Sequence, residues 1–239
     1  MTWSIVAHDA KTDAFAVAVA TRAFAVGAHC PFVRAGVGAV STQSMTNRYL
    51  GPAILDGMAR GLPPSAAIEG ALAGDEGSGL RQVHAVDRFG RTAAWTGRNC
   101  VEWRGSVSAE GISVAGNMLA GEPTIVQTLR TWNVEDELPM PERLMEAMLA
   151  GEAAGGDRRG KQSAAMVMVT TEDFPDLNLR VDDHAEPLGE LRRLLGIWRI
   201  EGVSRLGTAP SKANPSGLID LDAIEAGWIA RGLDLRFRR

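Results

Sequence analysis

The fold of this chain is decided close to its beginning, by residues 2–21, which read TWSIVAHDAKTDAFAVAVAT. Two apolar stretches, Thr2–Ala7 and Ala14–Thr21, flank a polar turn over residues 8–13 and predict two strands. In the second stretch phenylalanine and valine alternate with alanine, so both faces of that strand are apolar. A half-exposed sheet would carry polar residues on one face. The second strand is therefore predicted to be buried on both sides, with its alanines admitting a second layer at close range.

The rest of the chain alternates predicted strands with predicted helix pairs. Glycine-rich and proline-rich turns separate the segments, and region 201–216, with its Gly, Pro and Ser, predicts a loop. Runs of strands separated by helix pairs favour an α+β fold of two stacked sheets covered by helices on both outer faces. We expect one domain over residues 1–200, with residues 201–239 forming a loop and a C-terminal helical appendage packed on it. Strands are expected at 36–42, 82–87, 91–96, 112–116, 163–170 and 177–181, and helices at 51–60, 63–73, 123–132, 141–154, 187–198 and 219–232.

Composition narrows the class of protein. The 239 residues are 45% hydrophobic and 23% charged, with a net charge of −4, which argues against a nucleic-acid binder. No apolar stretch reaches the length of a membrane span, since Arg22 interrupts the longest, and no signal peptide is recognisable. The two cysteines, Cys30 and Cys100, fit a reduced, cytoplasmic protein, and burial is the preferred interpretation of each over a nucleophilic role.

Thr2 is the first candidate for catalysis. Removal of the initiator methionine before a small residue would leave a free α-amino group beside the threonine hydroxyl. Such an amine titrates near pH ~7.7–8.0 and can accept the hydroxyl proton without a histidine partner. Threonine at position 2 is also common in proteins that use it for nothing, so the residue alone leaves both interpretations open.

Two polar clusters interrupt the apolar pattern at predicted strand ends. The segment 41–47 contains Thr42, Gln43 and Asn47, whose hydroxyl and amide groups suit either a polar ligand or a turn. Asn117 follows another strand, where its amide could hold an oxyanion or close the strand and cap the next helix.

Two charged clusters follow. The segment 155–163, GGDRRGKQS, contains Asp157 and Arg158 and suits either an anion site, with Arg158 clamping a substrate carboxylate, or a solvated helix-to-strand turn. Asp182, Asp183 and His184 carry metal-ligand side chains, but neighbours on a strand point to opposite faces, so these three are poorly placed to meet one ion. The histidines His8, His29 and His84 have no partner pattern and are interpreted as structural.

These clusters resemble a bacterial family catalogued as domain-of-unknown-function family 1028, placed among the N-terminal-nucleophile (Ntn) hydrolase-like folds. The resemblance covers roughly residues 2–196, and the glycine-aspartate-arginine block is its most specific part. It implies a four-layer αββα sandwich with Thr2 as the nucleophile. Threonine-type Ntn hydrolases often carry an acidic residue where this chain has Thr21-Arg22, and a lysine where it has Gly36-Val37-Gly38. The matching segments are residues 2–7, 34–40, 42–44, 155–164 and 180–184.

The leading functional hypothesis is hydrolysis of a linear amide or related C–N bond in a small polar molecule. Thr2, Asn117 and Asp157 are the expected catalytic residues, and Thr42, Gln43, Asn47 and Arg158 the expected substrate-binding residues. No cofactor or metal is expected, and the expected partner is a small-molecule substrate, with a homodimer possible and neither nucleic acid nor membrane. The alternative is a catalytically silent ligand-binding or assembly protein on the same scaffold.

Overall fold

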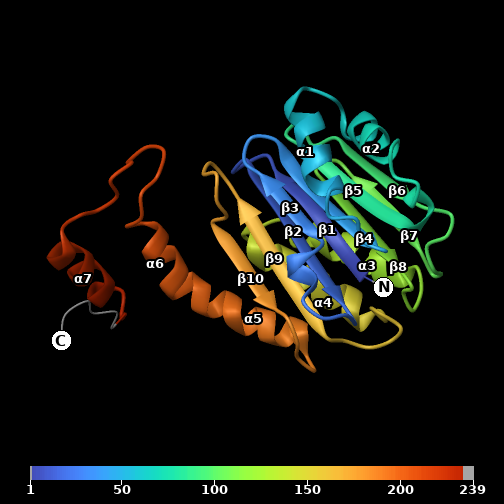
Figure 1. Ribbon diagram of the computed structural model, residues 1–239. Helices are drawn as coiled ribbons and strands as arrows, with labels where there is room; N and C mark the ends of the chain where they lie inside the picture. The colour runs from blue at the N-terminus through green and yellow to red at the C-terminus, as the bar shows by residue number, and fades with distance from the viewer. Residues whose placement is uncertain (1, 234–239) are drawn as a thin grey trace. The chain divides into compact units, whose positions relative to one another are not determined.

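The computed structural model describes residues 2–233, and the chain divides into two compact units, Met1–Leu191 and Arg192–Arg239. The first unit contains two antiparallel sheets (Figure 1). Sheet A has the strand order β10-β9-β2-β1-β8-β7, and sheet B the order β3-β4-β5-β6. The strands of sheet A are β1 (Thr2–Asp9), β2 (Ala14–Thr21), β7 (Gly105–Ala109), β8 (Ile112–Asn117), β9 (Ser163–Val169) and β10 (Leu177–Val181); those of sheet B are β3 (Pro31–Arg34), β4 (Gly38–Ser44), β5 (Arg81–Asp87) and β6 (Thr92–Thr96).

The two sheets pack face to face, and each carries a pair of helices. Strand β1 contacts β4 and β5, and β8 contacts β5, so the centres of the sheets meet. Helices α1 (Leu50–Ala59) and α2 (Pro64–Leu72) contact the strands of sheet B. Helices α3 (Pro123–Val134) and α4 (Met140–Ala153) contact strands β1, β2, β7 and β8 of sheet A (Figure 1). The predicted α+β protein with two sheets is confirmed.

Strand β2 owes its central place to its two apolar faces. All eight of its residues are buried, and it pairs with β1 on one side and β9 on the other. It contacts α4 from one face and β3 and β4 from the other. Because large and small apolar side chains alternate, the strand packs against α4 on one face and against sheet B on the other. Its neighbour β1, which begins at Thr2, is also an inner strand of sheet A.

Strands β3 and β7 were missed by the sequence analysis. Both lie at the edge of a sheet, and neither has a fully buried face: β3 is half-buried throughout and β7 is largely exposed. An edge strand packs on fewer neighbours, so its sequence carries a weaker apolar alternation. The strand predicted at 36–42 is displaced by two residues, to β4.

The second unit is largely helical. Helix α5 (Pro187–Ile197) crosses the boundary between the units and continues as a π-helical turn over Trp198–Gly202, followed by α6 (Val203–Leu206) and α7 (Leu221–Ala230). The loop predicted at 201–216 is therefore wrong at α6. In the second unit, Ile224, Trp228 and Leu233 form a buried apolar cluster. The predicted boundary at residue 200, and the packing of 201–239 on the first domain, stay predictions.

Over residues 2–233 no helix has both the length and the apolar character needed to span a membrane.

Candidate functional site

Thr2 and Asn117 are direct partners in the antiparallel pairing of β1 with β8. Thr2 begins its strand and Asn117 ends its own, so both lie at one end of sheet A. Directly opposed residues of an antiparallel pair share a face, with Cβ atoms about 4.5–5.5 Å apart. The structure thus brings together two of the three predicted catalytic residues.

The Thr2 hydroxyl lies 3.3 Å from the Thr21 hydroxyl, at the end of β2. Thr2 is 6% exposed and Thr21 2%, so this hydroxyl pair is almost enclosed. Gln43 of β4 approaches from the other sheet, with its Nε2 3.5 Å from the Thr2 carbonyl oxygen. Thr2 is therefore surrounded by polar groups of β2, β4 and β8.

A buried polar network lies between the sheets next to Thr2. Ser4 Oγ donates to Gln43 Oε1 over 2.8 Å and lies 2.7 Å from His84 Nε2, while His84 Nδ1 lies 3.1 Å from Ser113 Oγ. All four side chains are fully buried. Burial lowers the pKa of His84 to about 3, so the ring is neutral and has one donor and one acceptor for its two serine neighbours.

Gln82 is the centre of the network. Its Oε1 accepts from Gln43 Nε2 and from Asn117 Nδ2, both over 2.9 Å. Its Nε2 lies 2.8 Å from the Gly116 carbonyl oxygen and 3.0 Å from Thr96 Oγ1. One side chain therefore connects β4 and β6 of sheet B to β8 of sheet A and orients the Asn117 amide.

Asp157, the third predicted catalytic residue, lies in the loop after α4 and is connected to Thr2 indirectly. Its Oδ2 accepts from the backbone N–H of Arg22 over 2.6 Å, directly after Thr21. Its backbone forms an isolated bridge with Leu119, two residues after Asn117. Three glycines of the loop, at 155, 156 and 160, have φ angles of 125°, 53° and 108°, which L side chains rarely adopt. The glycines thus allow the turns of this loop, and the Asp157 carboxylate holds the end of β2.

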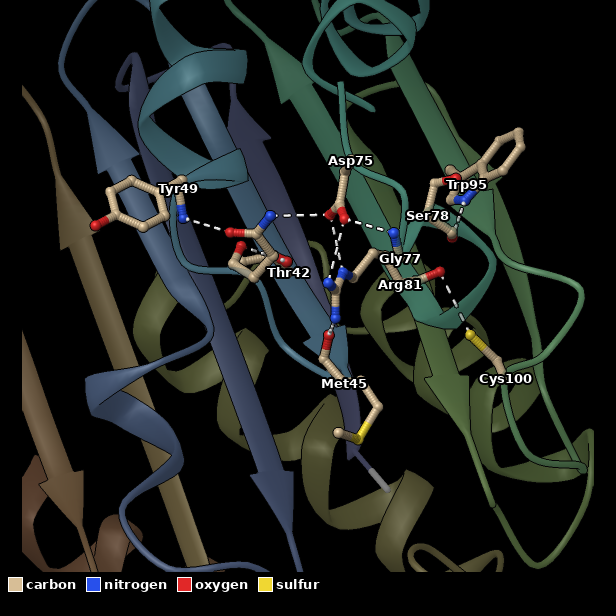
Figure 2. A network of polar contacts seen from close by, with 10 residues as sticks. Thr42, Met45, Tyr49, Asp75, Gly77, Ser78, Arg81, Trp95 and Cys100 are labelled. Atoms are coloured by element: carbon tan, nitrogen blue, oxygen red, sulfur yellow. Dashed lines mark hydrogen bonds and ion pairs between the residues drawn. The ribbon is translucent and has the colours of Figure 1, made fainter. Parts of the chain in front are cut away.

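Thr42 and Asn47 belong to a different network, drawn in Figure 2. Thr42 Oγ1 donates to the Asn47 carbonyl oxygen over 3.3 Å, and Asn47 Nδ2 donates to Asp75 Oδ2 over 2.8 Å. Arg81 Nε donates to the same oxygen over 2.9 Å, and the Gly77 N–H donates to Asp75 Oδ1 over 2.9 Å. These contacts hold the pKa of Asp75 well below its usual range. Thr42 and Asn47 thus shape a loop, and their side chains contact that loop and Asp75.

The remaining candidates lie apart from Thr2. Arg158 is exposed beside Asp157. Asp182 pairs with Arg180, Asp183 accepts from Gln162 Nε2, and His184 Nδ1 accepts from the Glu186 N–H, so the three potential ligands have separate partners. Residues 2–233 contain no group of three or more His, Cys, Asp or Glu side chains placed to hold one metal ion.

Both cysteines are buried, as predicted. Burial raises the pKa of the Cys30 thiol to about 12, so this side chain stays protonated at neutral pH and lacks the thiolate that nucleophilic attack needs.

A small hollow of about 130 Å³ opens beside Thr21. Trp3 and Thr21 line it from sheet A, Glu152 from α4, and Asp157 and Lys161 from the glycine loop. Lys161 Nζ lies 2.9 Å from Glu152 Oε2 and 2.5 Å from Glu186 Oε2. Two larger hollows, of about 510 and 540 Å³, flank Trp95 on sheet B.

Sequence reasoning missed the network residues Ser4, Gln82 and His84, together with Thr21 and Glu152. His84 was interpreted as an isolated structural histidine, whereas Ser4 and Ser113 contact its two ring nitrogens. A signal for the network was present in the sequence. In four strands, polar residues recur at spacing two or at a multiple of two, which places them on one face of each strand. They are Thr2 and Ser4, Ser41 and Gln43, Gln82 and His84, and Ser113 and Asn117.

Two solved structures and one family model are similar to this chain. The crystal structure of protein SPO2555 from Silicibacter pomeroyi is 28% identical, covers 92% of this chain and 96% of its own, and superposes with a TM-score of 0.85. Anbu (ancestral beta-subunit) from Yersinia bercovieri is 10% identical, covers 88% and 99% of the two chains, and gives a TM-score of 0.36. The search of curated proteins gave no match. The model of the family of unknown function DUF1028 matches residues 2–191, and the chain belongs to that family.

Proposed function

We propose that this protein is an N-terminal-nucleophile hydrolase that cleaves a linear amide or related C–N bond in a small polar molecule. In this proposal the two helix-covered sheets form the αββα sandwich of Ntn hydrolases. The observation that carries it is the position of Thr2, which begins an inner strand and has its hydroxyl 3.3 Å from Thr21, beside the small hollow.

The chemistry requires that Thr2 carry a free α-amine. The amine takes the hydroxyl proton as Oγ1 attacks the carbonyl carbon, and the resulting oxyanion is held by an N–H donor. Collapse of this intermediate breaks the C–N bond, and the departing amine takes the proton from the α-ammonium group. Water, activated by the same amine, then hydrolyses the threonine ester and releases the acid.

The neighbours of Thr2 have roles in this scheme. Asn117 lies opposite Thr2, and one of its two amide N–H groups is held by Gln82 Oε1, which leaves the other as an oxyanion donor. Thr21 orients the Thr2 hydroxyl, and Asp157 fixes the end of β2 through the Arg22 N–H. Arg158, exposed on the same loop, can meet a substrate carboxylate.

The test begins with the mass of the intact protein, which reports whether Thr2 is the first residue. A panel of small amides, ureides and acylated amino acids is then screened for turnover. Thr2→Ala is expected to remain folded and to lose activity, and Thr2→Ser to keep part of it, since hydroxyl and amine both survive. Blocking the amine should cost about 10²–10⁴-fold. Thr12→Ala, in the exposed turn after β1, is the matched control and should leave the rate unchanged.

An unchanged rate of amide hydrolysis in Thr2→Ala would contradict the assignment of Thr2 as the nucleophile. A retained methionine with no turnover on any amide would favour the silent ligand-binding scaffold instead.

A further inference from the structure

We propose that the hollow beside Thr21 binds an uncharged primary carboxamide or ureido group, which forms the non-reacting end of the substrate. The inference rests on the proposed function only in calling the occupant a substrate. The binding site itself is argued from a buried carboxylate oxygen, a neighbouring ammonium group and the size of the hollow.

The first observation is a carboxylate oxygen without a donor. Glu152 lines the hollow, its side chain is 16% exposed, and its Oε2 pairs with Lys161. Its Oε1 is buried, and no donor from residues 2–233 reaches it. A buried acceptor without a partner is costly, and more so when it is charged. An occupant that brings an N–H group to this oxygen would remove that cost.

The second observation is a donor beside the acceptor. Lys161 also lines the hollow, and an ammonium group has three N–H donors. Two of them face Glu152 Oε2 and Glu186 Oε2, at 2.9 and 2.5 Å, and the third is available to a carbonyl oxygen. These same contacts raise the pKa of Lys161, which keeps the amine protonated at neutral pH. An acceptor and a donor side by side match the N–H and C=O groups of one amide.

The charged side chains around the hollow disfavour a charged ligand. A cation at Glu152 Oε1 would lie close to the Lys161 ammonium, which already neutralises this carboxylate. An anion would meet the carboxylates of Glu152 and Asp157, and Asp157 is already bonded to Arg159 and to the Arg22 N–H. An uncharged group with both a donor and an acceptor avoids both conflicts.

The size of the hollow agrees with a small polar group. Its volume is about 130 Å³, roughly four times the share of one water molecule in the liquid. Gly155, Gly156 and Gly160 line the wall, and an added Cβ at Gly155 would lie 2.7 Å from Ala120 Cβ. Thr21 lines the hollow, and its hydroxyl lies 3.3 Å from the Thr2 hydroxyl, so one residue connects the hollow to the proposed nucleophile.

The experiment compares two probes of nearly equal size, N-acetylglutamine and N-acetylglutamate, by ligand-observed saturation-transfer NMR titration. Wild-type protein is expected to bind N-acetylglutamine at least about tenfold more tightly, because the carboxylate of N-acetylglutamate faces Glu152 Oε1. Glu152→Gln should reverse this preference, since its amide would direct N–H groups into the hollow while its oxygen faces Lys161. Glu186→Gln, which removes the outer contact of Lys161 without lining the hollow, is the matched control and should keep the wild-type preference.

Equal binding of the two probes to wild type, or an unaltered preference in a folded Glu152→Gln, would overturn the proposal. Thr2→Ala separates the two hypotheses, because it should bind N-acetylglutamine as wild type does. If the protein binds the carboxamide but hydrolyses no amide, the proposed carboxamide site is supported and the assignment of Thr2 as nucleophile is contradicted. If the protein hydrolyses an amide but does not prefer the carboxamide probe, the proposed function is supported and the carboxamide site is contradicted.

Discussion

Asn117 Nδ2 donates to Gln82 Oε1 over 2.9 Å and so joins the end of one sheet to the start of a strand in the other. The same oxygen accepts from Gln43 Nε2, whose other contacts are the carbonyl oxygens of Ala115 and Thr2. Two glutamine amides thus satisfy backbone groups of β1 and β8 at the interface of the sheets. The candidate site and the contact between the sheets are held by the same bonds.

Gln82→Met is expected to destabilise the protein by about 2–4 kcal/mol. The substitution keeps the side-chain volume but leaves the amides of Gln43 and Asn117 and the Gly116 carbonyl short of partners in a buried place. Urea unfolding at neutral pH measures the loss. Gln127→Met, at a half-buried position of α3, is the control and should change stability little. A loss of the same size in both variants would show that the network is not its cause.

His84 is expected to make the protein sensitive to acid. Its pKa is about 3 in the folded protein against an ordinary value of 6.5, so between these values the unfolded chain binds the extra proton. The contribution of neutral His84 to the free energy of unfolding is therefore complete above pH 6.5. It is lost as the pH is lowered toward 3, with a slope of up to about 1.4 kcal/mol per pH unit.

Urea unfolding at a series of pH values between 8 and 4 checks this sign. His84→Gln should be less stable than wild type at pH 8 but should lose less stability on acidification. His184→Gln removes an exposed histidine and should reproduce the wild-type slope. An undiminished slope in His84→Gln would contradict the assignment.

Asp75→Asn is expected to cost about 1–2 kcal/mol at neutral pH, because the carboxylate, in a side chain that is 11% exposed, accepts charge-assisted bonds from Arg81. The pKa of Asp75 lies below its ordinary 3.8, owing first to Arg81 and then to Asn47, so its contribution is present above that pH and is lost as the pH falls further. Thermal unfolding of variant and wild type should therefore converge in acid. Asp56→Asn removes a surface ion pair with Arg34, in which the Asp56 side chain is 53% exposed, and it should have little effect on stability.

Two glycine substitutions in helices are expected to have opposite signs. Gly70→Ala in α2 meets no atom within 4 Å and should stabilise by about 0.5–1 kcal/mol. Gly151→Ala in α4 places a Cβ on the Thr128 hydroxyl and 3.1 Å from the Thr124 carbonyl oxygen, so it should destabilise by about 1–3 kcal/mol despite the better helix former. Calorimetry of the two variants measures both signs. Stabilisation by both would mean that α3 and α4 are not packed as closely as the structure describes.

The inner strands and the family were predictable because they depend on local pattern. The alternation in Ala14–Thr21 specifies a strand buried on both faces, whatever its partners are. The edge strands β3 and β7 lack that pattern, since an edge strand needs less apolar surface. The resemblance predicted over residues 2–196 is confirmed by the family match over 2–191.

The site was predictable only where its residues stand at strand ends. Thr2 and Asn117 end up opposite each other because each terminates its strand at the same edge. The contacts of His84 with Ser4 and Ser113 depend on strand register and on the packing of one sheet on the other, which no local pattern specifies. All the predicted roles remain predictions: the catalytic ones of Thr2, Asn117 and Asp157 and the substrate-binding ones of Thr42, Gln43, Asn47 and Arg158.

The pairing of β1 with β8 also bears on the order of events during synthesis. Thr2 is made about 115 residues before its partner Asn117. At about 5–20 residues per second, one edge of β1 stays open for roughly 6–23 s. Thr2 is 6% exposed once the sheets have closed, so its surroundings are most open to other proteins during this interval. The enclosure of the proposed nucleophile therefore depends on the synthesis of a strand far along the chain.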